Sequence, residues 1–163
     1  MADESSWIGK EIGNYRLVRE VDSGSFGTVY EGKHIIFEDE PVVAIKVLHA
    51  PFRSPKEREQ FIKEAQVLKK LNHSNILRIL DAGFHTGIPY LVTEFAPGGS
   101  LRDRLDLQAG KPLPLEEALT MLEHIGQACM WLINRVSSIV TSSRTTSSSM
   151  RKELPSLLTL ALP

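Results

Sequence analysis

The sequence lacks the features of secreted, membrane-spanning or nucleic-acid-binding proteins. Cys129 is its single cysteine, which excludes an internal disulfide and fits a reducing, cytoplasmic location. The formal net charge is −1, so no basic excess points to a nucleic acid. No apolar run approaches the roughly 20 residues of a membrane helix, and the first residues, M-A-D-E-S-S-W, do not form a secretory signal. What is present is a 163-residue chain with 42% hydrophobic residues, enough for one folded domain.

Residues 15–46 hold the pattern that is most informative about function. Two alternating stretches, 15–21 and 28–34, flank the sequence D-S-G-S-F-G, which predicts a β-hairpin whose tip is mostly bare backbone. Glycine at such a tip lets main-chain N–H groups close on an anionic oxygen. A third strand is predicted at 42–48, apolar except for Lys46. A glycine loop beside a fixed ammonium predicts a polyphosphate site, although a hairpin turn without a ligand is the alternative for the loop alone.

These segments resemble the N-terminal lobe of a protein kinase. The glycine-rich loop of that family, G-x-G-x-x-G-x-V, is matched by Gly24, Gly27 and Val29, and its V-A-I-K strand by residues 43–46. Asp22 stands where the family has its first glycine, and we expect a carboxylate there to weaken the grip on the phosphates. The resemblance implies that ATP is bound by the loop and the neighbouring strands, that is, by Val21, Asp22, Ser23, Gly24, Ser25, Phe26, Gly27, Val29, Ala44 and Lys46.

A helix is predicted from Ser54 to about Leu71. Ser54 as N-cap, proline at the first helical position and glutamate three residues after the cap mark its start. An apolar stripe follows at Phe61, Ala65, Leu68 and Leu71, and Glu64 lies on the same face. In the kinase family this glutamate pairs with the lysine of the V-A-I-K strand, so the resemblance implies a Lys46–Glu64 ion pair. A solvated Glu64 at the edge of the stripe is the alternative.

Two more strands are predicted at 76–80 and 90–95, separated at Gly83 and at Gly87-Ile88-Pro89. The second leads into T-E-F-A-P-G-G-S, which is similar to the family's linker between lobes. The likeness makes Thr93 the gatekeeper at the back of the adenine pocket and assigns the backbone of Glu94 to Ala96 to hydrogen bonds with the base. A short helix after Ser100 and a long one follow, with apolar residues at helical spacing: Leu115, Ala118, Leu119, Leu122, Ile125 and Cys129, the last predicted to be a packed thiol.

The expected fold class is α+β. It is a kinase-like N-terminal lobe (residues 14–96) with a five-stranded antiparallel sheet and one main helix, preceded by a lead-in at 1–13. Residues 97–130 would form the short helix and the first long helix of an incomplete C-terminal lobe. Residues 131–163 are predicted to be a disordered tail, because ten of the thirteen residues from 137 to 149 are serine or threonine.

The tail also lacks the family's catalytic loop, H-R-D-x-x-x-x-N, and its D-F-G motif, which supply the base and the magnesium ligands. The codons of Ile139-Val140-Thr141, shifted by one base, permit His-Arg-Asp, and the codons that follow permit the rest of the catalytic loop. We therefore hypothesise that the tail is a frameshift product, from a real lesion or a sequencing error. The coding DNA around codons 126–133 decides this hypothesis.

The resemblance implies the ATP-binding part of a bacterial-type serine/threonine protein kinase, which transfers a phosphoryl group from ATP to a protein hydroxyl with Mg²⁺. The expected partners are ATP and, in a full-length kinase, a protein substrate. Because no catalytic or metal-binding residue is assigned in this chain, we expect no detectable phosphoryl transfer from it alone. The alternatives are a non-catalytic kinase-like module that binds a partner and a damaged gene product without a role.

Overall fold

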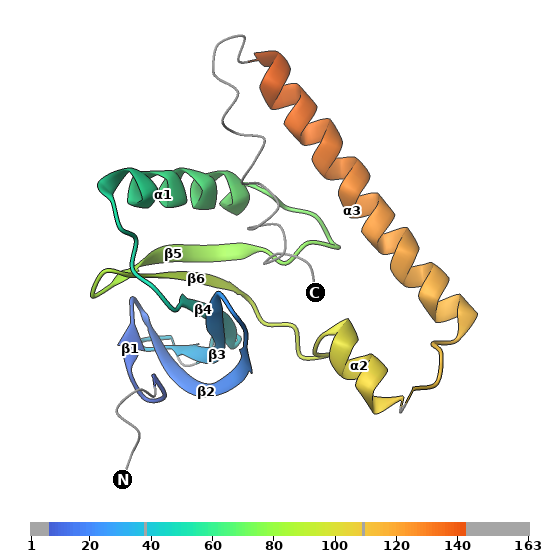
Figure 1. The fold of residues 1–163 in the computed structure, drawn as a ribbon, viewed down its shortest axis with the longest axis horizontal. Helices are drawn as coiled ribbons and strands as arrows, with labels where there is room; N and C mark the ends of the chain where they lie inside the picture. Colours follow the sequence, from blue (N-terminus) through green and yellow to red (C-terminus); the bar gives the residue numbers. More distant parts are fainter. Residues whose placement is uncertain (1–6, 38, 109, 143–163) are drawn as a thin grey trace. The chain divides into compact units, whose positions relative to one another are not determined.

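The computed structural model describes residues 7–37, 39–108 and 110–142. The chain divides into two units, coloured along the sequence in Figure 1. The sheet unit comprises the residues up to Asn72 together with Arg78–Ala96, and the helical unit comprises His73–Leu77 and the residues from Pro97 onward.

The sheet unit is built on one antiparallel sheet of six strands in the order β1-β2-β3-β4-β6-β5. The strands are β1 (Glu11–Ile12), β2 (Tyr15–Ser23), β3 (Gly27–His34), β4 (Val43–Leu48), β5 (Ile79–His85) and β6 (Ile88–Glu94). The predicted α+β class is confirmed, but the sheet has six strands instead of five. The additional strand lies in the predicted lead-in, where Ile12 is fully buried and pairs with Tyr15 of β2.

The strand predicted at 76–80 was wrong in its bounds, because the structure has β5 at Ile79–His85. Residues 81–83, expected between strands, lie inside β5, and the chain reverses at Thr86-Gly87. Both of these residues have positive φ, 50° and 86°, as a tight two-residue hairpin turn requires. Gly83 lies within the strand because a side chain there would collide with Tyr90 of β6. The Tyr90 hydroxyl oxygen lies 2.7 Å from where a Cβ of residue 83 would be.

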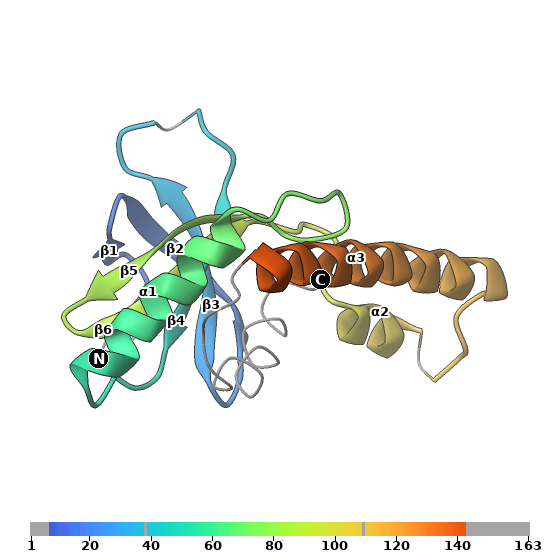
Figure 2. The same ribbon diagram turned by 90° about the horizontal axis from the view of Figure 1, so that it is seen from above.

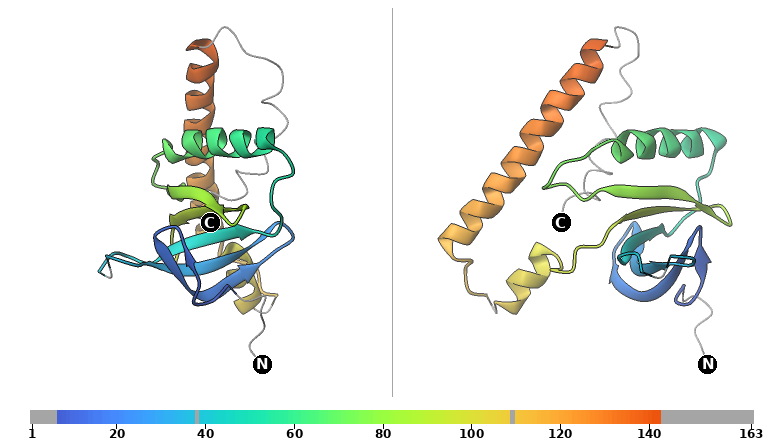
Figure 3. Two further views of the ribbon diagram at one scale, coloured as in Figure 1. Left: turned by 90° about the vertical axis from the view of Figure 1, so that its left-hand side faces the viewer. Right: turned by 180° about the vertical axis from the view of Figure 1, so that it is seen from behind.

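Side-chain alternation along β4 separates a core face from a second face. Val43, Ile45 and Val47 are buried in the main core, together with Ile12, Leu17, Tyr30, Tyr90 and Val92. Their neighbours Ala44 and Lys46 are half-buried. Successive strand residues point to opposite sides of a sheet, so Ala44 and Lys46 lie on the face away from this core. Figure 3 shows the β1–β3 end of the sheet curling away from the β5–β6 pair.

Helix α1 (Pro55–Lys69) begins as predicted. The Ser54 side chain accepts a hydrogen bond from the Glu57 N–H, 3.2 Å away. Phe61, Ala65 and Leu68 are its buried residues, which confirms the predicted stripe within the helix. The helix lies along β5 (Figures 1 and 2), where the ring of Phe61 packs against Phe84, 5.5 Å between centroids.

The helical unit contains α2 (Leu101–Leu107) and α3 (Leu115–Ser142). A capping box between Ser100 and Asp103 starts α2. Trp131 and Leu132 of α3 pack against Ile76 and Ala128, and the Asn75 side-chain amide donates to the His124 carbonyl at 3.0 Å. These contacts hold the segment 73–77 on the long helix.

Two predictions about this unit were wrong. The helix continues to Ser142, so residues 131–142 are not a disordered tail. Cys129 is exposed, because the buried residue at this turn is its neighbour Ala128. The predicted tail beyond Ser142 lies outside the described residues. Among the helices of the described ranges, none has both the length and the apolar composition needed to cross a bilayer.

Candidate functional site

The glycine loop between β2 and β3 is fixed to its surroundings at its base and exposed at its tip. The Gly24 N–H donates to the Gly27 carbonyl at 3.1 Å, and the His49 N–H donates to the Phe26 carbonyl at 3.2 Å. Phe26, at the tip, is 80% exposed. The Thr28 hydroxyl oxygen lies 3.0 Å from both the Ser23 hydroxyl oxygen and His49 Nε2, which joins both strands to the end of β4.

Gly27 is required by the packing of this loop. A Cβ at this position would lie 2.5 Å from the Val47 carbonyl oxygen, closer than real side chains come to backbone. Gly24 has no such neighbour within 4 Å. One glycine therefore lets β3 approach β4 closely, and the other leaves the loop backbone open to a ligand.

Lys46 and Asp22 lie in one row across three strands. Asp22 is the register partner of Val29, and Val29 is the register partner of Lys46. Directly paired residues of neighbouring strands share a face of the sheet, so all three side chains belong to the face away from the main core. The structure thus brings the loop, its following valine and the lysine together, as the sequence predicted.

The Lys46 ammonium has no hydrogen bond or ion pair with any of the residues that the structure describes. Burial lowers the pKa of Lys46, and the negative charge of Asp22 acts in the opposite direction. A half-buried cation without a partner is costly. The arrangement is therefore suited to an anionic ligand that would supply the missing contacts.

The expected Lys46–Glu64 ion pair is not formed, and this prediction was wrong for the structure in hand. Glu64 is half-buried and accepts a hydrogen bond from Gln60 Nε2 at 2.6 Å. Gln60 lies one turn earlier on the same helix, so the carboxylate is satisfied locally. Neither Lys46 nor Glu64 takes part in any of the ion pairs between described residues.

The residues predicted to contact a base lie at the end of β6. Ala44 of β4 is the register partner of Thr93, which is only 9% exposed. The Glu94 N–H already donates to the Arg78 carbonyl at 3.0 Å, and the Thr93 hydroxyl donates to the Glu94 carbonyl at 3.0 Å. The Ala96 N–H has no hydrogen-bond acceptor among the described residues. Of the predicted backbone groups, the Glu94 N–H is therefore already engaged, whereas the Ala96 N–H is not engaged by any described residue.

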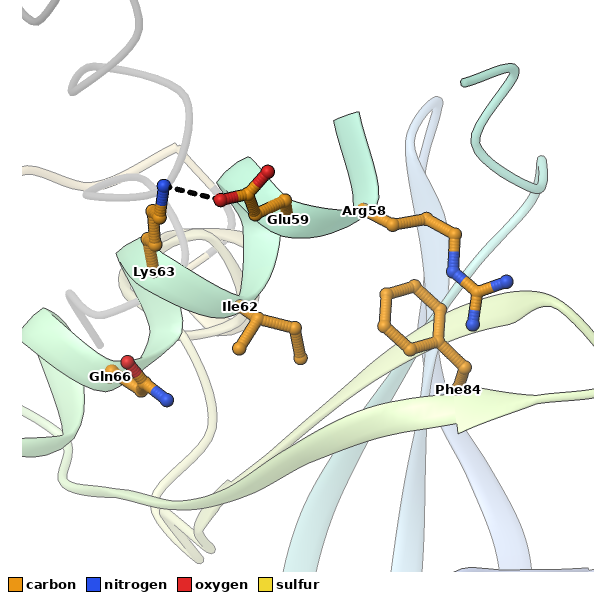
Figure 4. Close-up of a pocket in the computed structure, with 6 residues that line it drawn as sticks. All are labelled: Arg58, Glu59, Ile62, Lys63, Gln66 and Phe84. Carbon is orange, nitrogen blue, oxygen red and sulfur yellow. Dashed lines mark ion pairs between the residues drawn. The ribbon is translucent and has the colours of Figure 1, made fainter. Parts of the chain in front are cut away.

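A hollow that the sequence did not indicate lies between α1 and β5. It has a volume of about 460 Å³ and is lined by Arg58, Glu59, Ile62, Lys63, Gln66 and Phe84 (Figure 4). Arg58 places its guanidinium 4.4 Å from the centre of the Phe84 ring, and Lys63 pairs with Glu59 at 2.6 Å. Neither the glycine loop nor Lys46 lines it.

No group of three or more histidine, cysteine, aspartate or glutamate side chains within the described ranges could hold a metal ion. These residues therefore do not fit a metal site built from protein ligands alone.

Residues 15–137 match the family model for protein tyrosine and serine/threonine kinases. The chain belongs to the protein kinase family. Members of this family use ATP and Mg²⁺. The matched segment extends into α3, beyond the point at which the sequence had seemed to lose its likeness to a kinase.

The relatives of this kinase chain include plant and bacterial enzymes. It is 39% identical over 93 residues to serine/threonine-protein kinase ATG1b of Arabidopsis thaliana, which covers 57% of this chain and 13% of the relative. It is 37% identical over 123 residues to serine/threonine-protein kinase PrkC of Bacillus subtilis, which covers 74% of this chain and 18% of the relative. The chain thus spans less than a fifth of the length of either relative.

A solved structure agrees with this assignment. The kinase domain of PknI from Mycobacterium tuberculosis matches with a TM-score of 0.63 and 26% identity, over 74% of this chain and 48% of that domain. The chain therefore corresponds to about half of a kinase domain, the half that begins with the small lobe.

Proposed function

We propose that this chain is the nucleotide-binding part of a serine/threonine protein kinase and that it binds ATP through the β2–β3 loop and Lys46. The observation that carries the proposal is the half-buried Lys46 ammonium, which has no partner within the described ranges and lies in register with Val29 beside the glycine loop. An exposed loop backbone with open space around Gly24 and a fixed cation are the two contributions that a polyphosphate needs.

The remaining predicted site residues complete this proposal. Val29 and Ala44 offer half-buried apolar surface to the base, and the Ala96 N–H offers a donor. Thr93, small and buried, would limit the depth of the pocket. Glu64 enters the site only if α1 moves or turns, so that the Glu64 carboxylate gives up its hydrogen bond from Gln60 and pairs with Lys46. A movement of this helix controls activity in the family.

The proposal for the longer kinase is phosphoryl transfer from ATP to a serine or threonine hydroxyl of a protein, in the cytoplasm. Neither H-R-D nor D-F-G occurs in these 163 residues. Since those motifs supply the base and the metal ligands, the role proposed for this chain itself is to bind and orient the nucleotide, and not to complete the transfer.

The proposed function is tested by calorimetric titration of ATP into the chain and into Lys46→Ala. We expect measurable binding to the wild type and a loss of at least tenfold in affinity for Lys46→Ala, because a charge-assisted contact to phosphate is removed. Lys33→Ala, which removes an exposed lysine from β3, is the matched control and should bind as the wild type does. Equal binding by all three proteins would contradict the proposal.

A second candidate function is a non-catalytic binding module. It is favoured by one observation: the apolar stripe of α3 is uncovered, with Leu115, Leu119, Leu122 and Ile125 exposed by 73%, 55%, 64% and 45%. Stripes of this kind mark contact surfaces. A defined complex that persists in Lys46→Ala and is lost in Leu122→Glu would favour this function.

A further inference from the structure

Asp22 is a carboxylate in the row of Lys46 and has no counter-ion. It is exposed, it stands opposite Val29, and no ion pair joins it to any described residue. Two strand spacings separate its backbone from that of Lys46, roughly 10 Å. A lysine side chain can cover much of that span, so the two charges act on each other across Val29.

A second carboxylate on the same face shows why Asp22 is the relevant one. Glu31 is the register partner of Ala44, two pairs further along β3 and β4 and therefore on the same face as the Val29–Lys46 pair. Its charge is neutralised by Arg19, with the two side-chain atoms 2.6 Å apart. Asp22 has no such neighbour, which agrees with the direction in which it shifts the pKa of Lys46. It is therefore the uncompensated negative charge beside the loop.

We propose that Asp22 makes the nucleotide site discriminate against magnesium-free ATP, by competing with phosphate oxygens for the Lys46 ammonium and repelling the triphosphate. This inference rests on the proposed function. The Coulomb energy scales with the charge of the ligand, which is about −4 for free ATP and about −2 for its magnesium complex. The carboxylate therefore penalises the free nucleotide more strongly than the complex.

The test compares ATP affinity in excess EDTA and in excess Mg²⁺ by calorimetry, for the full chain and for Asp22→Asn. The substitution keeps the size of an exposed side chain, so circular dichroism should be unchanged. We expect binding of magnesium-free ATP to tighten about fourfold and binding of the magnesium complex about twofold, in the range of exposed charge pairs. Both gains should shrink as salt is added.

Glu20→Gln is the matched control. It removes the same charge from the same strand, but Glu20 is the register partner of the buried Tyr30 and so belongs to the core side of the sheet. In this variant, the ratio of the affinity for magnesium-free ATP to the affinity for the magnesium complex should stay at the wild-type value.

The outcomes separate the inference from the function on which it rests. If wild type binds ATP in a Lys46-dependent way and Asp22→Asn has the wild-type ratio, the role of Asp22 is refuted and the proposed function stands. Weaker binding of the magnesium complex by Asp22→Asn would also refute it, since the carboxylate would then be a metal ligand. If neither wild type nor Asp22→Asn binds ATP, the proposed function fails, and the inference with it.

Discussion

At the scale of single residues, the two loop glycines differ in what surrounds them. A Cβ on Gly27 would meet the Val47 carbonyl oxygen at 2.5 Å and Leu48 Cα at 3.2 Å, so β4 itself would have to move. A Cβ on Gly24 would meet no atom within 4 Å, and Gly24 is not among the positive-φ glycines. Gly27 therefore serves the fold, and Gly24 leaves space for a ligand.

Gly27→Ala should therefore destabilise the chain, by about 1–3 kcal/mol as for other overpacked sites. Gly24→Ala should change the free energy of unfolding by less than about 0.5 kcal/mol. Urea unfolding followed by circular dichroism measures both values. Equal losses in the two variants would show that the close approach of β3 to β4 is not what requires glycine.

Single residues also show what a sequence can and cannot reveal. Lys46, Val29 and the loop were predictable, because each is marked by residue type and spacing. The Lys46–Glu64 pair was not found, since the position of a side chain on a helix face does not say whether a nearer donor, here Gln60, takes the carboxylate. The predicted packed position of Cys129 was wrong by one residue, because the side chain that is buried at this turn of α3 is that of Ala128.

At the scale of elements, α1 is the best-predicted part because local chemistry marks its start. The Ser54 side chain accepts from the Glu57 N–H, and the Glu57 carboxylate accepts from the Arg53 N–H at 2.7 Å. The first bond satisfies an amide donor that a helix start otherwise leaves to water, and the second ties the residue before the cap to the first turn.

Ser54→Ala should lower the free energy of unfolding by about 1 kcal/mol, because one N-terminal amide of α1 loses its acceptor. Ser54→Asp should retain most of the stability, since aspartate is an equally good cap and its charge suits a helix N-terminus. Thermal unfolding of the two variants beside wild type checks this. An alanine variant as stable as the aspartate variant would be evidence against the cap.

The strands were harder to predict, and for a physical reason. β5 contains Gly83, which a one-dimensional pattern interprets as an interruption, whereas the Tyr90 hydroxyl from β6 fills that space. β1 has only two residues, too few for any alternation to be visible. In both cases a cross-strand partner, absent from the local sequence, decides the structure.

At the scale of the whole molecule, the chain combines a small lobe with a long helix whose apolar stripe is uncovered. The serine-rich composition after residue 137 led to the prediction of an early end to order, but the preceding Trp131 and Leu132 pack against Ile76. The family match reaches residue 137 and the helix Ser142. The frameshift hypothesis stays a prediction, and the coding DNA around codons 126–133 tests it.

The most direct test of the central claim is deuterium uptake of the 163-residue chain with and without ATP. We expect ATP to slow uptake in residues 21–29 and in β4 of the wild type, and to cause no such change in Lys46→Ala. Unchanged uptake at the loop and at β4, or a decrease confined to the hollow between α1 and β5, would contradict the claim that this loop and this lysine bind the nucleotide.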